Sequence, residues 1–137
     1  MSEKLKNKLE AVQQLLSELK AESTKGVPII VEGQKDVDAL KEFGINGAII
    51  SAKTCAKSFS DVLFQLEKQK YKEVILLFDF DRRGVEWTKR LKQCLEQTKI
   101  KPNVHFWSSL KAFLGHDIKD IESLTTYLQT LQRKSGE

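Results

Sequence analysis

The sequence lacks long apolar runs, and this absence excludes a transmembrane helix. The longest uninterrupted run, Val74–Phe78, has five residues, whereas a helix needs about 20 apolar residues to cross a bilayer. The first residues, MSEKLKNKLE, contain no apolar core of the kind found in a secretory signal peptide. We therefore expect a cytoplasmic protein with no membrane partner.

Cysteine is also scarce, which excludes a disulfide framework and argues against a zinc site. The two cysteines, Cys55 and Cys94, lie far apart without metal-ligand spacing, and we interpret both as reduced packing residues. Apolar residues make up 40% of the chain and charged residues 31%, which is typical of a globular protein and too apolar for a disordered one. A length of 137 residues fits a single domain.

Positive charge is modest overall but unevenly distributed. The net charge is +4, yet residues 52–101 contain twelve Lys or Arg against seven Asp or Glu, a net charge of +5. Such a cluster is compatible with a polyanionic partner. It is equally compatible with a solvated face, so the charge alone does not identify a nucleic-acid-binding protein.

The apolar pattern predicts an α/β domain preceded by a helix. In residues 1–22, apolar side chains recur at steps of four and three, which predicts an amphipathic helix that docks on the domain rather than pairing with a second copy. Predicted strands span 27–31, 47–51, 73–80 and 103–107, and predicted helices span 36–43, 59–70, 85–98, 108–114 and 117–131. Apolar strands separated by helices indicate a mainly parallel sheet of about four strands, flanked by helices. We divide the chain into residues 1–26 (helix and linker), 27–107 (core) and 108–137 (C-terminal helical extension).

Two predicted strands end in acidic residues. Glu32 follows the strand in IIVEGQKD, and Asp79 and Asp81 follow the strand in VILLFDFDRRG. Asp79 and Asp81 point to the same side of an extended chain, and Glu32 joins them if the two strands are neighbours. Three clustered carboxylates repel one another unless a cation compensates, and Mg²⁺ suits such an all-oxygen site. Alternatively, Asp81 caps the following helix and Glu32 pairs with a nearby Lys or Arg.

Basic residues flank these acids. Arg82 and Arg83 directly follow Asp81, and Lys53 and Lys57 lie in the predicted loop after the second strand. Arginine binds phosphate through paired donors, so these four side chains are candidates for nucleic-acid binding. The alternative is that they only balance the carboxylates or contact water.

Several other residues receive a structural interpretation. Trp87 and Trp107 are interpreted as core residues, although either could stack on a base. His105, placed in the fourth strand, and His116 show no metal-ligand spacing. Asp117 is interpreted as the N-cap of the last predicted helix.

The order of these motifs resembles the Toprim domain, shared by type IA topoisomerases, bacterial primases, OLD-type nucleases and the nuclease that matures 5S ribosomal RNA. The matching residues are Glu32 and Gly33 with Asp36, the loop Ser51–Thr54, then Asp79, Asp81 and Gly84. The whole chain looks most like small stand-alone Toprim proteins of archaea and some bacteria. The resemblance implies that Asp79 and Asp81, with Glu32, bind Mg²⁺ or Mn²⁺, and that Glu32 acts as general acid or base. It also implies that Gly33, Asp36 and Gly84 support the ligands or shape the turns around them.

The functional implication is a magnesium-dependent protein that cleaves or processes nucleic acid, RNA in preference to DNA, as a monomer or homodimer. The RNA preference follows from analogy with the 5S RNA nuclease. The alternative is a non-catalytic module that binds RNA or a ribonucleoprotein and retains the acids. Only Tyr71 and Tyr127 are present, so topoisomerase strand passage is not expected. Haloacid-dehalogenase phosphatases also carry a DxD motif, but they have Thr or Val where this chain has Arg83.

Overall fold

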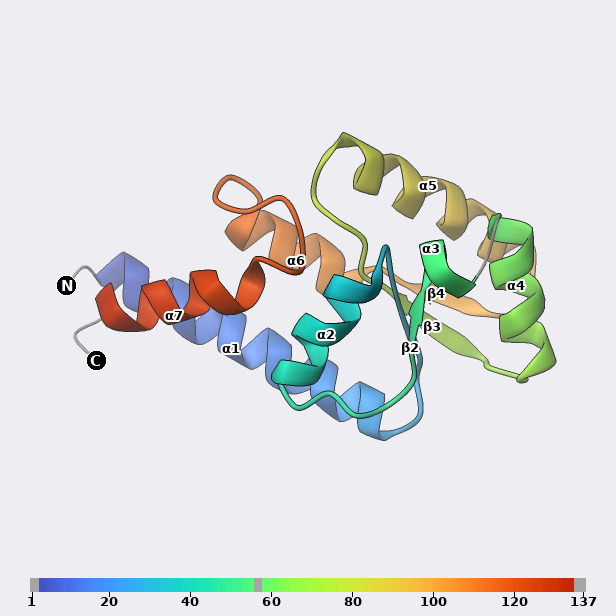
Figure 1. Ribbon diagram of the computed structural model, residues 1–137, viewed down its shortest axis with the longest axis horizontal. Helices are drawn as coiled ribbons and strands as arrows, with labels where there is room; N and C mark the ends of the chain where they lie inside the picture. The colour runs from blue at the N-terminus through green and yellow to red at the C-terminus, as the bar shows by residue number, and fades with distance from the viewer. Residues whose placement is uncertain (1–2, 56–57, 135–137) are drawn as a thin grey trace.

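The computed structural model describes residues 3–55 and 58–134. These residues form four short strands, which make one sheet, and the helices that surround it (Figure 1). The elements in chain order are α1 (Glu3–Thr24), β1 (Ile29–Val31), α2 (Gln34–Glu42), β2 (Ile49–Ser51), α3 (Ala52–Cys55), α4 (Phe59–Lys68), β3 (Glu73–Leu76), α5 (Arg82–Glu96), β4 (Lys101–Asn103), α6 (His105–Leu114) and α7 (Leu124–Lys134). The predicted α/β class is confirmed, including the additional helix at the N-terminus.

The four strands form one parallel sheet in the order β2-β1-β3-β4. The chain runs from β1 to β2 on one side, then returns past β1 to place β3 on the other side. In parallel sheets, a ligand-binding crevice forms where the connections diverge in this way, outside the carboxyl ends of the two strands. Here those strands are β1 and β3, paired through Ile30 and Leu76, and both lead directly into the acidic motifs.

Helices cover both faces of the sheet because the central strands are apolar on both sides. Ile29, Val31 and Ile75 face a core built with α1, α2, α6 and α7. Ile30 and Leu76 face a second core that includes residues of α4 and α5. Figure 1 shows α4 and α5 on the side of the sheet opposite α1. The carboxyl ends of β1 and β3 therefore lie between two layers of helices.

The N-terminal helix α1 packs against α6 and α7. Its apolar residues at the predicted steps of three and four are buried in the first core, namely Leu9, Val12, Leu16 and Leu19. Lys8 on α1 also forms a 2.6 Å ion pair with Asp117, which accepts a second hydrogen bond from the Tyr127 hydroxyl at 2.7 Å. Apolar burial and this polar contact together hold α1 against the C-terminal part of the chain.

Three sequence-based assignments are wrong. The fourth strand is Lys101–Asn103 rather than 103–107, because the Asn103 side chain accepts the His105 amide and α6 begins there. The last helix begins at Leu124 rather than 117, and Asp117 binds Lys8 instead of capping a helix. The predicted loop after β2 contains the short helix α3.

Candidate functional site

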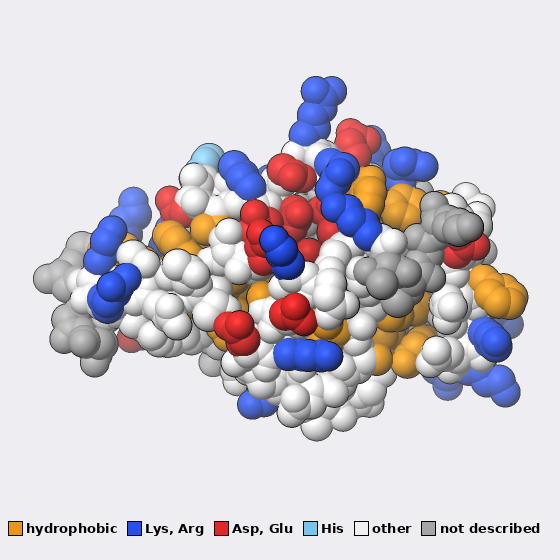
Figure 2. All heavy atoms as spheres, in the orientation of Figure 1, with side chains coloured by type: hydrophobic (Ala, Val, Ile, Leu, Met, Phe, Trp, Pro, Cys, Tyr) orange, Lys and Arg blue, Asp and Glu red, His pale blue; other side chains and the backbone are white. Residues whose placement is uncertain are grey.

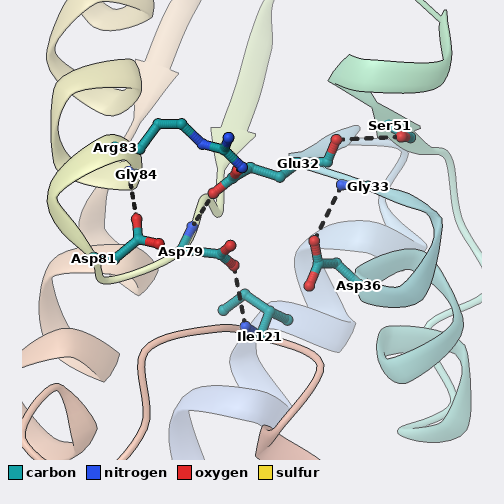
Figure 3. Close-up of polar contacts among 9 residues, drawn as sticks. All are labelled: Glu32, Gly33, Asp36, Ser51, Asp79, Asp81, Arg83, Gly84 and Ile121. Atoms are coloured by element: carbon teal, nitrogen blue, oxygen red, sulfur yellow. Dashed lines mark hydrogen bonds and ion pairs between the residues drawn. The ribbon is translucent and has the colours of Figure 1, made fainter.

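Glu32 lies at the end of β1 with its side chain only 2% exposed, and its carboxylate has two partners in the protein. One oxygen accepts a 2.8 Å hydrogen bond from the Arg83 guanidinium, forming an ion pair. The other accepts a 3.3 Å hydrogen bond from the backbone amide of Asp79 (Figure 3). The carbonyl of Glu32 accepts the amide of Lys53 at 3.0 Å. Glu32 and Asp79 therefore meet, as the strand order requires, but Arg83 supplies the charge that compensates Glu32.

Asp79 is a half-buried carboxylate with an unfavourable electrostatic environment. Burial raises its pKa to about 8, and the hydrogen bond with the Glu32 side chain and the negative charges of Asp36 and Glu32 act in the same direction. The Ile121 amide, 3.3 Å from Asp79 Oδ1, acts in the opposite direction but is outweighed. The Trp107 indole N–H donates to the Asp79 carbonyl at 3.2 Å. Asp79 is thus the position where a further positive charge would be most stabilising.

Asp81 is exposed and caps α5, because its carboxylate accepts the Gly84 amide at 2.8 Å. The capping alternative raised by the sequence thus describes this residue. Gly84 itself lies against the turn at Asp79, where a Cβ atom would come 1.9 Å from the Asp79 carbonyl oxygen. Only glycine lets α5 begin this close to the acidic turn.

Asp36 is buried and connects two segments of the site. Its carboxylate accepts the Gly33 amide and the Glu122 amide, each at 3.1 Å. Burial is the main cause that raises its pKa, and the two amides only partly oppose this effect. The amides of Ile121 and Glu122 therefore bind Asp79 and Asp36, respectively, so the loop between α6 and α7 forms one wall of the site (Figure 3).

Replacing Asp36 by alanine should lower the free energy of unfolding by about 2 kcal/mol, because two partly buried amides lose their acceptor. Urea unfolding followed by circular dichroism measures the loss. The matched control is Asp38→Ala on the exposed side of α2, with an expected change below about 0.5 kcal/mol. Faster hydrogen exchange at the Glu122 amide should accompany the Asp36 change, and unchanged exchange would contradict the hydrogen bond described.

The donor set fits a hard divalent cation in chemistry, although it is not arranged as a complete metal site. Among residues 3–55 and 58–134, no group of three or more His, Cys, Asp or Glu side chains is positioned to hold a metal. Glu32 pairs with Arg83, and Asp81 uses one oxygen for the helix cap. Nevertheless, all candidate ligands are carboxylates, which suit Mg²⁺ or Mn²⁺ with waters completing the coordination shell. The raised pKa of Asp79 indicates that the negative charge is incompletely compensated.

Three of the four candidate phosphate-binding residues, Lys53, Arg82 and Arg83, lie beside the acids in the described part of the chain. Arg82 and Arg83 open α5 and are exposed, and Lys53 is exposed on α3. Arg83 also lies over the Trp87 ring, 5.2 Å from its centroid. Lys57 lies outside the described residues. Figure 2 shows acidic side chains gathered in a hollow near the centre of the visible face, with lysine and arginine side chains around it.

Sequence reasoning missed two features of this site. The contacts of Ile121 and Glu122 with the acids join residues 42 and 86 positions apart through backbone amides, which leave no residue-type signal. Trp107, interpreted as a core residue, donates its indole N–H to Asp79. The Arg83 contact with Glu32 confirms the alternative in which a nearby Lys or Arg pairs with this acid, and the sequence alone does not identify which one.

Comparisons with known proteins agree with the motifs. The model of the Toprim domain matches residues 27–107. A UPF0292 protein of Methanosarcina acetivorans is 36% identical over 96% of this chain and 89% of the relative. A UPF0292 protein of Methanocaldococcus jannaschii is 38% identical over 87% of this chain and 91% of the relative. A solved protein structure from Aquifex aeolicus is similar with a TM-score of 0.68 and 32% identity, covering 81% of this chain and 95% of that one.

Proposed function

The chain belongs to the Toprim domain family, and from this premise we propose that it is a Mg²⁺-dependent enzyme that cleaves or processes phosphodiester bonds, in RNA rather than DNA. The family match supports a fold that binds metal and acts on nucleic acid, and the resemblance predicted from the motifs is confirmed. Within the described residues, no helix has the length and apolar character needed to cross a membrane. The observation that carries the proposal is the incompletely compensated carboxylate of Asp79, which lies beside Glu32. The exposed side chains of Lys53, Arg82 and Arg83 form a basic rim near these acids.

Each residue of the site has a chemical role in this proposal. Asp79 and Asp81, with Glu32, would hold Mg²⁺, with Mn²⁺ as the second candidate. When bound, the ion would offset the negative charge that develops on a phosphate during bond cleavage. Arg82 and Lys53 would position the phosphate backbone from the rim.

Glu32 is the proposed general acid or base. Its two hydrogen bonds, from Arg83 and from the Asp79 amide, hold the carboxylate in one orientation. A group that transfers a proton in a transition state requires such fixed geometry. Arg83 is exposed over more than half of its side chain, so a phosphate could reach the same guanidinium that orients Glu32.

A second candidate function is a non-catalytic RNA or ribonucleoprotein-binding module. The observation that favours it is that two of the acids already have partners within the protein. Glu32 is paired with Arg83, and Asp81 caps α5. In such a module the carboxylates stabilise the fold, and the basic rim alone contacts the nucleic acid.

A cleavage assay separates the two functions. The probe is a 5′-labelled RNA hairpin with single-stranded flanks, incubated with the wild-type protein in Mg²⁺ or in EDTA. The enzyme hypothesis predicts cleavage only with Mg²⁺ and its loss in Glu32→Gln, which keeps a hydrogen-bond acceptor for Arg83. Binding of the hairpin without Mg²⁺-dependent cleavage would instead establish the binding module.

A further inference from the structure

A cavity lies beside the acidic site, between the start of α4 and the N-terminal half of α5. It encloses about 590 Å³, which is within the range of about 300–1,000 Å³ typical of small-molecule pockets. Its wall combines the aromatic rings of Phe59 and Trp87 with the cationic groups of Lys53 and Arg90. None of the lining residues that belong to the described part of the chain is acidic.

The aromatic rings of this cavity are held in fixed orientations. Phe59 and Trp87 meet edge to face, with centroids 5.8 Å apart and an interplanar angle of 88°. Trp87 makes a similar contact, at 5.7 Å and 86°, with Phe78, which is fully buried in the segment that follows β3. Phe59 and Trp87 are themselves only partly buried. The sequence-based interpretation of Trp87 as a core residue therefore describes only one side of the ring.

Arginine side chains lie over both rings. The Arg90 guanidinium is 5.2 Å from the centroid of Phe59, and the Arg83 guanidinium is 5.2 Å from that of Trp87. Arg83, Trp87 and Arg90 occupy positions i, i+4 and i+7 of α5, so they share one face of the helix. This face presents alternating cationic and aromatic groups, a combination that binds the base and the phosphate of a nucleotide together.

Arg83 and Lys53 link the cavity to the acidic site. Arg83 contacts the Trp87 ring and also binds Glu32 at 2.8 Å. Lys53 lines the cavity, and its backbone amide donates to the Glu32 carbonyl. A molecule in the cavity would thus lie one side chain away from the carboxylates.

We propose that this cavity is a nucleotide-binding subsite. The base packs against Phe59 and Trp87, and the phosphate contacts Lys53 and Arg90. The inference rests on the proposed function for the source of the nucleotide, which is an unpaired position of the RNA strand adjacent to the bond acted upon. An apolar ligand would leave Lys53 and Arg90 without an anionic partner, whereas a nucleotide offers a base to the rings and a phosphate to the cations.

Binding in EDTA tests the subsite without requiring catalysis. The probes are a fluorescein-labelled single-stranded RNA octamer, measured by anisotropy, and free adenosine 5′-monophosphate, measured by quenching of tryptophan fluorescence. Phe59→Leu keeps apolar volume but removes the ring, and should weaken octamer binding about tenfold, as expected for one lost base–aromatic stack. Arg90→Gln, which leaves the core intact, should weaken binding several-fold and reduce its salt dependence.

Matched controls are available in the same chain. Phe64 lies on α4 and is 66% exposed, and Arg133 lies on α7, at the opposite end of the molecule from α4 (Figure 1). Phe64→Leu and Arg133→Gln should bind the octamer within about twofold of the wild type. Circular dichroism confirms that each variant is folded.

The outcomes separate this inference from the proposed function. Equal octamer affinities for Phe59→Leu, Arg90→Gln and their controls overturn the subsite, even if the wild type cleaves RNA with Mg²⁺. Octamer binding that depends on Phe59 and Arg90 supports the subsite, even if no variant or wild-type protein cleaves. Dependence seen only with adenosine monophosphate would assign the cavity to a free nucleotide and overturn the strand as its source.

Discussion

Gly84→Ala is expected to lower the free energy of unfolding by about 3 kcal/mol, at the upper end of the usual cost of overpacking. The added methyl group would lie 1.9 Å from the Asp79 carbonyl oxygen and 2.5 Å from its carbon. Both are backbone atoms, so no side-chain rotation relieves the contact. Either α5 shifts away from the turn or the turn itself moves. In both cases the start of α5 moves away from the Asp79 backbone, and the hydrogen bond by which Asp81 caps the helix is disturbed. Urea unfolding measures the loss.

Gly33→Ala is the matched control, because Gly33 also begins a helix beside the acids. A Cβ atom at Gly33 would meet no atom within 4 Å, and its φ of −143° is accessible to any residue. We expect a change below about 0.5 kcal/mol. Equal stabilities for the two alanine variants would show that α5 does not pack against the turn.

The meeting of Glu32 and Asp79 could be predicted from the sequence, because it follows from strand order alone. Apolar segments followed by acids identify the carboxyl ends of strands, and neighbouring parallel strands end at the same edge. The segment 103–107 could not be assigned in this way. A short apolar stretch fits a strand or a helix equally well, and the Asn103 side chain, by accepting the His105 amide, decides in favour of the helix.

Charge compensation at the site was harder to predict than its location. The sequence predicts that three acids require a cation, but it does not distinguish a bound metal from an arginine. The structure places Arg83 on Glu32 because α5 begins directly after Asp81 and Gly84 brings its first turn against Asp79. One guanidinium therefore compensates Glu32, while Asp79 and Asp36 retain raised pKa values. In the proposed site, a divalent cation would therefore add to the positive charge that Arg83 places on Glu32 rather than replace it.

Asp79→Asn tests whether the Asp79 carboxylate lacks a compensating charge. The substitution should raise the stability of the fold without metal and lower it, relative to the wild type, with metal. The folded-state pKa of Asp79 is raised to about 8 from a usual value of 3.8. A raised pKa means that the protonated group stabilises the fold at low pH. This contribution is fully present below the usual value of 3.8 and is lost progressively until the pH has passed about 8. Asparagine cannot ionise. In EDTA at pH 9, the variant should therefore be more stable than the wild type by about 1 kcal/mol, since solvent screens a half-buried group.

Adding Mg²⁺ should make the wild type more stable than Asp79→Asn, which reverses the order of stability expected in EDTA. If Asp79 holds the ion, the wild type should gain about 2.7 kcal/mol when free Mg²⁺ reaches about 100 times its Kd, whereas Asp79→Asn should gain far less. Thermal unfolding at pH 7.5 with Mg²⁺ or EDTA measures both gains. Asp61→Asn, at an exposed position of α4, controls for nonspecific ion effects. Equal Mg²⁺ gains in wild type and Asp79→Asn would remove Asp79 from the metal site. A variant less stable than the wild type in EDTA at pH 9 would instead show that the Asp79 carboxylate is already compensated by the protein, which leaves the metal without an electrostatic reason to bind there.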